Sequence, residues 1–286
     1  MPLTYDVVDV FTDRAYAGNP LAVVHGAGHL TAEQMQTLAA EFGLSETVFP
    51  LPPTTSGADY RVRIFTPVSE LPFAGHPSVG AAWVLARAGL IDPGDVVQEC
   101  GAGLLPVQVS EWGARVAGGA PEVGPDLDGA ALAAAVGLGP DDLDPDLAAG
   151  VAGAGVRFAV LPVRADAVAR AVPDPAALRA LTVGLVALVV VHHDGTDAHV
   201  RVFAPGVGVT EDPATGSAAV ALAVFLVHRG AAQPDGQTGI SVAQGAEVGR
   251  PSRLMVLVQA EAGRAVRTSV YGNVARVARG EVLALP

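Results

Sequence analysis

Four polar residues of this 286-residue chain stand where side chains of their types could move a proton: Glu46, His76, Asp212 and Ser217. Glu46 follows Leu44-Ser45 and precedes the strand-like stretch Thr47-Val48-Phe49. Apolar surroundings raise the pKa of a carboxyl group, which makes it a credible general acid or base near neutral pH. A solvated carboxylate at the start of a strand is the alternative, and position alone leaves it open.

Two glycine-led segments, Gly75-His76-Pro77 and Gly216-Ser217-Ala218, stand at the expected starts of apolar helices. The first amides of a helix have no partner within the helix and carry partial positive charge, so each start could bind a carboxylate. His76 could exchange protons with a substrate held there. A hydrogen-bonded structural imidazole and two ordinary tight turns are the alternatives.

Asp212 stands just before Pro213 in the segment 211–217. Its carboxylate could cap the amides that follow, or it could orient His76. Ser217, His76 and Asp212 also have the residue types of a hydrolytic triad, but no Gly-x-Ser-x-Gly elbow surrounds the serine.

The same cassette occurs twice in the chain, at residues 61–85 and 201–226. In each copy an Arg-x-Phe-x-Pro strand leads through Glu, Pro and Gly into an apolar helix. Aligning the copies matches Glu70 with Glu211, Leu71 with Asp212, and His76 with Ser217. The shared glutamates indicate a shared structural role, whereas the positions that differ are candidates for function. Two similar halves that face each other could build one asymmetric site.

Composition excludes several kinds of chemistry. All 17 basic residues are arginine, so neither a lysine Schiff base nor a Walker-A phosphate loop is available. Cys100 is the only cysteine, which excludes an internal disulfide, a zinc–cysteine cluster and a two-thiol mechanism. His192, His193 and His199 flank an expected hairpin without a metal-site pattern, and we expect no metal.

The formal net charge of −12 disfavours nucleic acid and anionic membranes as partners. The most apolar window, residues 218–227, is too short to span a bilayer, and the start of the chain lacks the pattern of a secretory signal. We therefore expect a cytoplasmic protein whose partner is a small metabolite.

Strand and helix patterns alternate along both halves. Thr31 and Gln34 form a capping box that opens a helix, and Gly43 closes that helix. The other expected helices are 77–88, 127–136, 174–181 and 217–228, and the expected strands are 7–11, 21–24, 46–51, 60–65, 156–160, 185–191, 199–203, 254–259 and 266–277. Mixed strands with few helices predict an α+β fold, and the Gly/Pro-rich residues 113–125 are the best candidate for a linker.

Five segments resemble, in chain order, the motifs of the PhzF-like (phenazine-biosynthesis) isomerases: Asp9-x-Phe11, Gly18-Asn19-Pro20-Leu21-Ala22-Val23, residues 45–49, residues 73–77 and residues 211–218. The resemblance implies a diaminopimelate-epimerase-like fold. It has two pseudo-symmetric α+β domains, each a mixed strand layer around a central helix, with the active site in the cleft between them. The implied domains are residues 1–115 with a C-terminal strand at about 273–286, and residues 116–272. A homodimer without a cofactor is also implied.

The same resemblance implies residue roles. Glu46 would be the general acid/base, assisted by His76, Asp212 and Ser217. The residues that it implies for binding a small anionic substrate are Asn19, Gly75, Thr215 and Gly216. The best-understood family activity moves a proton within trans-2,3-dihydro-3-hydroxyanthranilate.

Related epimerases and proline racemases use two cysteines, but Ala74 and Thr215 stand at those places here, so a two-thiol racemase is excluded. The leading hypothesis is therefore a cofactor-free isomerase in which Glu46 removes a proton from one carbon and returns it to another. An isomerase of another secondary-metabolite pathway, such as alkylproline formation, is an alternative. So is a member that binds a small molecule without catalysis.

Overall fold

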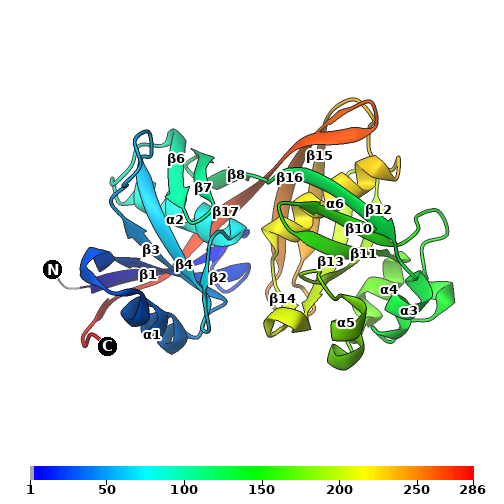
Figure 1. The fold of residues 1–286 in the computed structure, drawn as a ribbon, viewed down its shortest axis with the longest axis horizontal. Helices are drawn as coiled ribbons and strands as arrows, with labels where there is room; N and C mark the ends of the chain where they lie inside the picture. The colour runs from blue at the N-terminus through cyan, green and yellow to red at the C-terminus, as the bar shows by residue number, and fades with distance from the viewer. Residues whose placement is uncertain (1–2) are drawn as a thin grey trace. The chain divides into compact units, whose positions relative to one another are not determined.

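The computed structural model describes residues 3–286, which form two compact units (Figure 1). Unit 1 comprises Met1–Ala117 and Tyr271–Pro286, and unit 2 comprises Gly118–Val270. The last strand, β17 (Arg264–Val282), gives its first residues to unit 2 and the rest to unit 1. Within residues 3–286, no helix has the length and apolar character that crossing a membrane requires.

Unit 1 is a ring of paired strands. Its strands are β1 (Leu3–Val10), β2 (Asn19–His25), β3 (Glu46–Leu51), β4 (Tyr60–Phe65), β5 (Glu70–Leu71), β6 (Gly94–Cys100), β7 (Gly103–Val109) and β8 (Gly113–Ala117). Pairing runs from β1 through β2, β3, β4, β6, β7 and β8, and β17 then closes the ring against β1. The pairs β2–β3 and β4–β6 are parallel.

The helix α2 (Gly75–Arg87) lies at the centre of this ring (Figure 1). Residues 76–85 are all buried, and a helix in this position has to be apolar on every side. Gly80 lies so close to the sheet that a Cβ there would be 2.5 Å from Cδ2 of Leu21 and 2.9 Å from Cγ2 of Val10. The missing side chain therefore sets the distance between α2 and the strands β1 and β2.

The helix α1 (Ala32–Phe42) packs against β3 and β4 on the outside of the ring. The amide of Gln34 donates to the Thr31 hydroxyl at 3.3 Å, and the amide of Thr31 donates to the Gln34 side chain at 3.0 Å. Gly43 ends the helix in the left-handed conformation, with φ of 62°. Both predicted ends of this helix are confirmed.

Unit 2 repeats the plan of strands around a central helix. Its strands are β9 (Pro121–Asp126), β10 (Gly150–Ala154), β11 (Arg157–Pro162), β12 (Leu188–Asp194), β13 (Asp197–Ala204), β14 (Val209–Asp212), β15 (Gly236–Gln244) and β16 (Ser252–Glu261). The central helix, α6 (Gly216–His228), contacts β9, β10, β11 and β16 and is buried over residues 218–227. The pairs β11–β12 and β13–β15 are parallel. The predicted α+β class is confirmed.

Three short helices, α3 (Gly129–Ala134), α4 (Ala165–Arg170) and α5 (Pro175–Leu181), form a second apolar core in unit 2. Leu132, Val168 and Leu178 from these helices pack with Leu161 and Phe203 from the strands.

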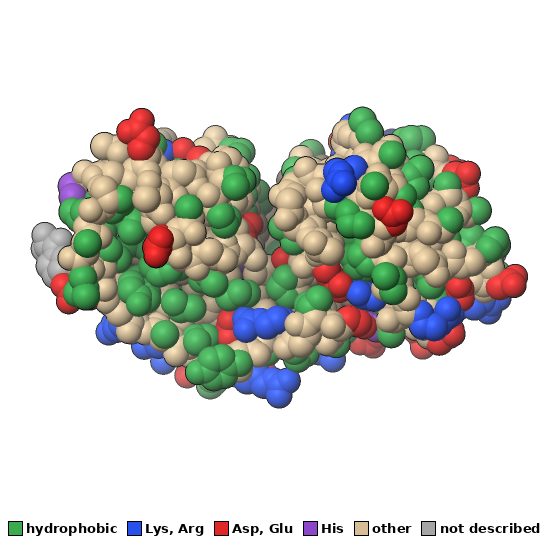
Figure 2. Space-filling view, turned by 90° about the horizontal axis from the view of Figure 1, so that it is seen from below, with side chains coloured by type: hydrophobic (Ala, Val, Ile, Leu, Met, Phe, Trp, Pro, Cys, Tyr) green, Lys and Arg blue, Asp and Glu red, His purple; other side chains and the backbone are tan. Residues whose placement is uncertain are grey.

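On the face shown in Figure 2, acidic, arginine and apolar side chains are interspersed rather than gathered by kind.

The Gly/Pro-rich stretch 113–125, which we expected to be a linker, is mostly the strands β8 and β9. The boundary between the two units, at Ala117 and Gly118, falls inside it. Gly113 begins β8, and the position requires glycine because the backbone of β17 at Gly272 leaves no room for a Cβ. The strands β6, β7, β10 and β15 were not predicted, since glycine and polar residues interrupt their apolar alternation.

Each copy of the repeated cassette holds an arginine–glutamate pair where the strand turns towards the central helix. In unit 1, Nε and Nη2 of Arg63 donate to the two carboxylate oxygens of Glu70 at 2.7 and 2.6 Å. In unit 2, Arg201 donates to Glu211 in the same way at 2.9 and 2.7 Å. In both copies the guanidinium also lies over the ring of the phenylalanine two residues later. The structural role predicted for the two glutamates is confirmed.

The two pairs differ in burial. The side chains of Arg63 and Glu70 are 27% and 42% exposed, whereas those of Arg201 and Glu211 are both 9% exposed. Nη1 of Arg201 also donates to the carbonyl of Ala171, just after α4, at 2.6 Å. Loss of the glutamate in unit 2 would therefore leave a buried cation, which loss of the glutamate in unit 1 would not.

We expect Glu211→Gln to lower the free energy of unfolding by about 3 kcal/mol, because it leaves the Arg201 guanidinium buried without its counter-charge. The matched change Glu70→Gln removes an exposed pair and should cost less than about 1 kcal/mol. Urea unfolding followed by circular dichroism measures both. Equal losses in the two variants would contradict this explanation.

Candidate functional site

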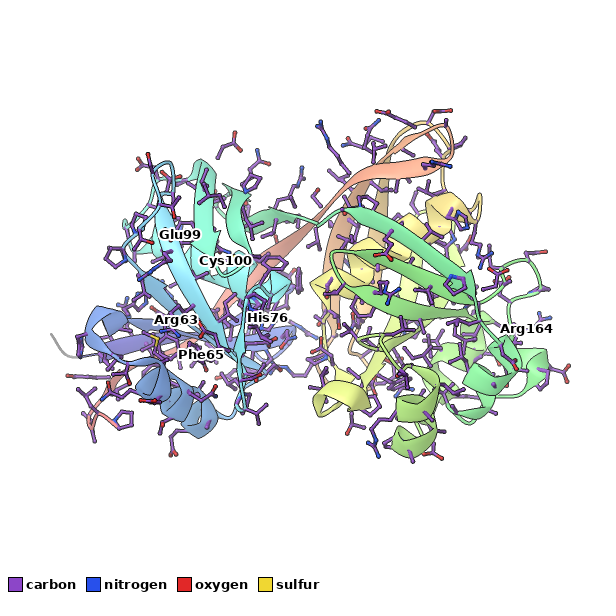
Figure 3. All side chains as sticks on the ribbon, in the orientation of Figure 1. Arg63, Phe65, His76, Glu99, Cys100 and Arg164 are labelled. Atoms are coloured by element: carbon purple, nitrogen blue, oxygen red, sulfur yellow. The ribbon has the colours of Figure 1, made fainter. Side chains whose placement is uncertain are left out.

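Glu46 and His76 lie together in unit 1. Glu46 is the first residue of β3 and pairs in register with Leu21 of β2, and His76 is the second residue of α2. Oε2 of Glu46 is 3.5 Å from Nδ1 of His76. The glutamate side chain is 17% exposed and the histidine side chain 6% exposed, so this carboxylate is shielded but still reachable. Figure 3 labels His76, at the start of α2, and Arg63 and Phe65, which belong to β4.

His76 is an uncharged imidazole over most of the pH range. Burial lowers its pKa from the ordinary 6.5 to about 3, and an interaction with the Pro20 backbone offsets this only in part. Among the described residues, its buried Nε2 has no hydrogen-bond partner. A buried polar atom of this kind is costly unless something else satisfies it, so Nε2 is available to a ligand.

The other residues predicted for unit 1 adjoin this pair. Asn19 begins β2 and is buried, directly before Pro20. Gly75 begins α2 after Ala74, and the first bond within that helix runs from the amide of Ser78 to the carbonyl of Ala74 at 3.3 Å. The amides of Gly75 and His76 therefore precede the helix's own hydrogen-bond ladder.

In unit 2, the four predicted residues lie at one loop–helix junction. Asp212 ends β14, and the Thr215 hydroxyl donates to its Oδ2 at 2.5 Å. Thr215 is the N-cap of α6, and its carbonyl accepts the first bond of that helix, from Ala219 at 3.0 Å. The amides of Gly216 and Ser217 therefore lie ahead of the ladder, next to an anchored carboxylate.

Sequence reasoning missed Gln244, the last residue of β15. Its amide nitrogen donates to the Asp212 carbonyl at 2.7 Å, and its amide oxygen accepts from the Thr215 amide at 3.1 Å. The only signal in the sequence is a polar residue at the end of an apolar run, before Gly245. Such a pattern is common, so the contact could not be found without the fold.

Two of the three histidines considered for a metal have other partners. Nε2 of His199 lies 2.8 Å from Glu247, and Nδ1 of His192 lies 3.3 Å from the Val163 carbonyl. Within residues 3–286, no group of three or more His, Cys, Asp or Glu side chains is placed to hold a metal ion.

Strands wrapped around a central helix in each of two units define a known class of fold. A probable proline racemase of Agrobacterium radiobacter superposes with a TM-score of 0.65, covering 99% of this chain and 93% of that chain at 16% identity. At that identity the likeness shows the fold alone. The predicted diaminopimelate-epimerase-like fold is confirmed, because proline racemases share it.

The chain belongs to the family of phenazine biosynthesis-like proteins, whose model matches residues 8–280. A PhzF-family protein of Bacillus anthracis has a TM-score of 0.90 and 27% identity, covering 99% of this chain and 100% of that chain. An uncharacterised isomerase of Mesorhizobium japonicum is 37% identical over 97% of this chain and 98% of its own. The trans-2,3-dihydro-3-hydroxyanthranilate isomerase of Pseudomonas aeruginosa is 36% identical over 96% of this chain and 98% of its own length. Like the relatives from Mesorhizobium japonicum and Pseudomonas aeruginosa, which are named isomerases, the chain is an isomerase.

The lowered pKa of His76 makes stability depend on pH. The unfolded chain takes up a proton at this residue below pH 6.5, but the native chain does so only near pH 3, so stability falls as pH drops between these values. The slope from this one group approaches about 1.4 kcal/mol per pH unit. We expect His76→Asn to flatten the curve of unfolding free energy over that window, whereas the exposed His29→Asn should not.

The 15N chemical shifts of the imidazole provide an independent measurement. They should report a neutral ring in the native protein at pH 5, since burial keeps the pKa near 3. A His76 ring that titrates with a pKa near 6.5 would contradict the burial described above.

Proposed function

We propose that this protein is a cofactor-free isomerase in which Glu46 moves a proton within a small carboxylate metabolite. The observation that carries the proposal is the 3.5 Å approach of Oε2 of Glu46 to Nδ1 of His76, at a carboxylate that is 17% exposed. A carboxylate in such a site can act first as a base and then, once protonated, as an acid. One group then serves both halves of the reaction, and no second thiol is needed.

His76 supports this cycle as a neutral group. With Nδ1 directed at the Glu46 carboxylate, the imidazole carries its proton on Nδ1 and leaves the Nε2 lone pair free to accept. A substrate hydroxyl or ammonium group could donate to Nε2. Because the imidazole stays uncharged, it does not stabilise the Glu46 anion as a full cation would, and so it preserves the basicity of that carboxylate.

The substrate's anionic group would be held by backbone amides. The chain has no lysine, and Arg63 and Arg201 are committed to Glu70 and Glu211. The amides of residues 216–218 precede the ladder of α6, whereas Pro77 removes one such donor from α2. The start of α6 is therefore the better binding site for a carboxylate. The Asp212 carboxylate beside it could accept hydrogen bonds from an ammonium or hydroxyl group.

The first substrate to test is trans-2,3-dihydro-3-hydroxyanthranilate, which the relative from Pseudomonas aeruginosa is named for. It is a small amino acid, so it offers a carboxylate to the helix amides and an ammonium to a carboxylate. We expect the active protein to be a homodimer, as the family resemblance implies, and to be cytoplasmic, as its composition indicates.

Glu46→Gln should abolish turnover, because an amide can neither remove nor return a proton. The wild-type enzyme in heavy water should place deuterium on the carbon skeleton of the substrate. In the variant we expect the rate of that incorporation to fall at least about 1,000-fold, in the range measured for loss of a general acid–base group.

The matched control is Glu41→Gln, which removes an exposed carboxylate at the end of α1 in the same unit. It should leave the rate unchanged. Full turnover by Glu46→Gln, with the variant folded as judged by circular dichroism, would remove the glutamate from its assigned role.

If the residues of both units act on one substrate, their effects should be coupled. We expect His76→Asn and Asp212→Asn each to lower kcat/KM by about 100-fold. The double variant should lose less than the product of the two, because residues that act on one transition state are not additive. Strict multiplication of the two losses, measured with the same substrate, would show that the residues act independently.

A further inference from the structure

We propose that Gln244 is a positioning residue that fixes the loop from Asp212 to Gly216 for the reaction. This inference rests on the proposed function, because the loop holds the carboxylate and the amides assigned to the substrate. Gln244 itself is 2% exposed and touches no substrate in the proposed arrangement. It would act only through the groups that it holds.

The amide of Gln244 makes three hydrogen bonds, all to this loop. Its Oε1 accepts from the Thr215 amide at 3.1 Å, and its Nε2 donates to the Asp212 carbonyl at 2.7 Å and to Oγ1 of Thr215 at 3.1 Å. The backbone partners also fix which way the amide faces. Turned over, it would set its NH2 group against an N–H and its oxygen against a carbonyl.

These bonds determine where the Thr215 proton points. Because Oγ1 of Thr215 accepts from Gln244, its own hydrogen is left for Oδ2 of Asp212, 2.5 Å away. A directed chain therefore runs from a buried amide through a hydroxyl to the carboxylate. The chain sets both the position of the carboxylate and which of its oxygens is already engaged.

The residues after Gln244 hold the same loop from the other side. The hydroxyl of Ser252 donates to the Pro213 carbonyl at 3.0 Å. Gly245 has φ of +80°, and a Cβ there would collide with the same carbonyl. The backbone beyond β15 thus packs directly against the loop, and Gln244 adds side-chain bonds to both Asp212 and Thr215.

Unit 1 has no equivalent amide at the matched position. In the two cassettes, Arg61 corresponds to His199, and these residues pair with Glu99 and Ala243 respectively. The next residue is Gln244 in unit 2 but Cys100 in unit 1. The hydrogen bonds from a glutamine to the loop before the central helix are therefore specific to unit 2, which carries Asp212.

In unit 1 the nearest glutamine is Gln98, two residues before Cys100 on β6. Gln98 is fully buried, and its Nε2 donates to the Ser78 hydroxyl at 2.9 Å while its Oε1 accepts from the Tyr60 hydroxyl at 3.2 Å. Gln98 lies on β6, which pairs with β4 as β15 pairs with β13. Its side chain bonds to no residue that we propose to contact the substrate. Gln98 is therefore the matched control for Gln244.

The experiment compares Gln244→Met with Gln98→Met. Methionine keeps the length of the side chain but makes no comparable hydrogen bond. We expect Gln244→Met to lower kcat about 10- to 100-fold, with a smaller change in KM, because the groups remain present but are no longer held in the reacting geometry. We expect hydrogen exchange at the Thr215 amide to accelerate at least about tenfold.

Gln98→Met should lower the melting temperature by a similar amount, yet leave kcat and Thr215 exchange within about twofold of wild type. If both variants lose activity in step with their melting temperatures, the effect of Gln244 is general destabilisation and the proposal is wrong. It is also wrong if a folded Gln244→Met has unchanged exchange and unchanged kcat.

If Gln244→Met does not fold, Gln244→Glu takes its place. A carboxylate can still accept from the Thr215 amide, but it cannot donate to the Asp212 carbonyl or to the Thr215 hydroxyl. The same loss of kcat is expected, and full activity would overturn the proposal. The exchange measurement needs no substrate, so it tests Gln244 even if the wild-type enzyme shows no isotope incorporation, a result that would sink only the proposed function.

Discussion

The turn from the cassette strand into the central helix is the constraint on which the rest of the structure depends. A helix inside a ring of strands has to begin near the ring's open end, and the turn before it carries charged residues through a partly buried region. The Arg63–Glu70 and Arg201–Glu211 pairs neutralise that turn in both units. With the turn fixed, the first backbone amides of the helix point away from it and make no hydrogen bond within the helix.

Duplication supplies two such helix starts, and the two starts differ in their polar residues. In unit 1 the start carries His76, and the neighbouring strand brings Glu46 to 3.5 Å from it. In unit 2 the start follows Asp212, which Thr215 and Gln244 hold in place. The neutral state of His76 is a consequence of its depth in the ring, because burial, offset only in part by the Pro20 backbone, lowers its pKa to about 3. The same packing that stabilises the helix therefore sets the protonation state at the site.

Local signals were enough for much of the fold. The capping box at Thr31 and Gln34, the closing glycine at position 43 and the duplicated cassette each depend on neighbours in sequence. The strand β15 was missed because its residues, GQTGISVAQ, alternate weakly, and its place is decided by pairing with β13 and β16. Gln244 was missed for the same reason, since its three bonds reach residues about 30 positions away. The approach of Glu46 to His76 likewise depends on ring closure, which no local pattern specifies.

The central claim is that the Glu46 carboxylate carries one proton between two carbons of the same molecule. Substrate labelled with deuterium at the carbon that loses its hydrogen tests this most directly, in a single turnover with rapid quenching. We predict that wild-type enzyme delivers part of the label to the receiving carbon, and that Glu46→Gln delivers none. A folded Glu46→Gln protein that transfers the label as the wild type does would contradict the account.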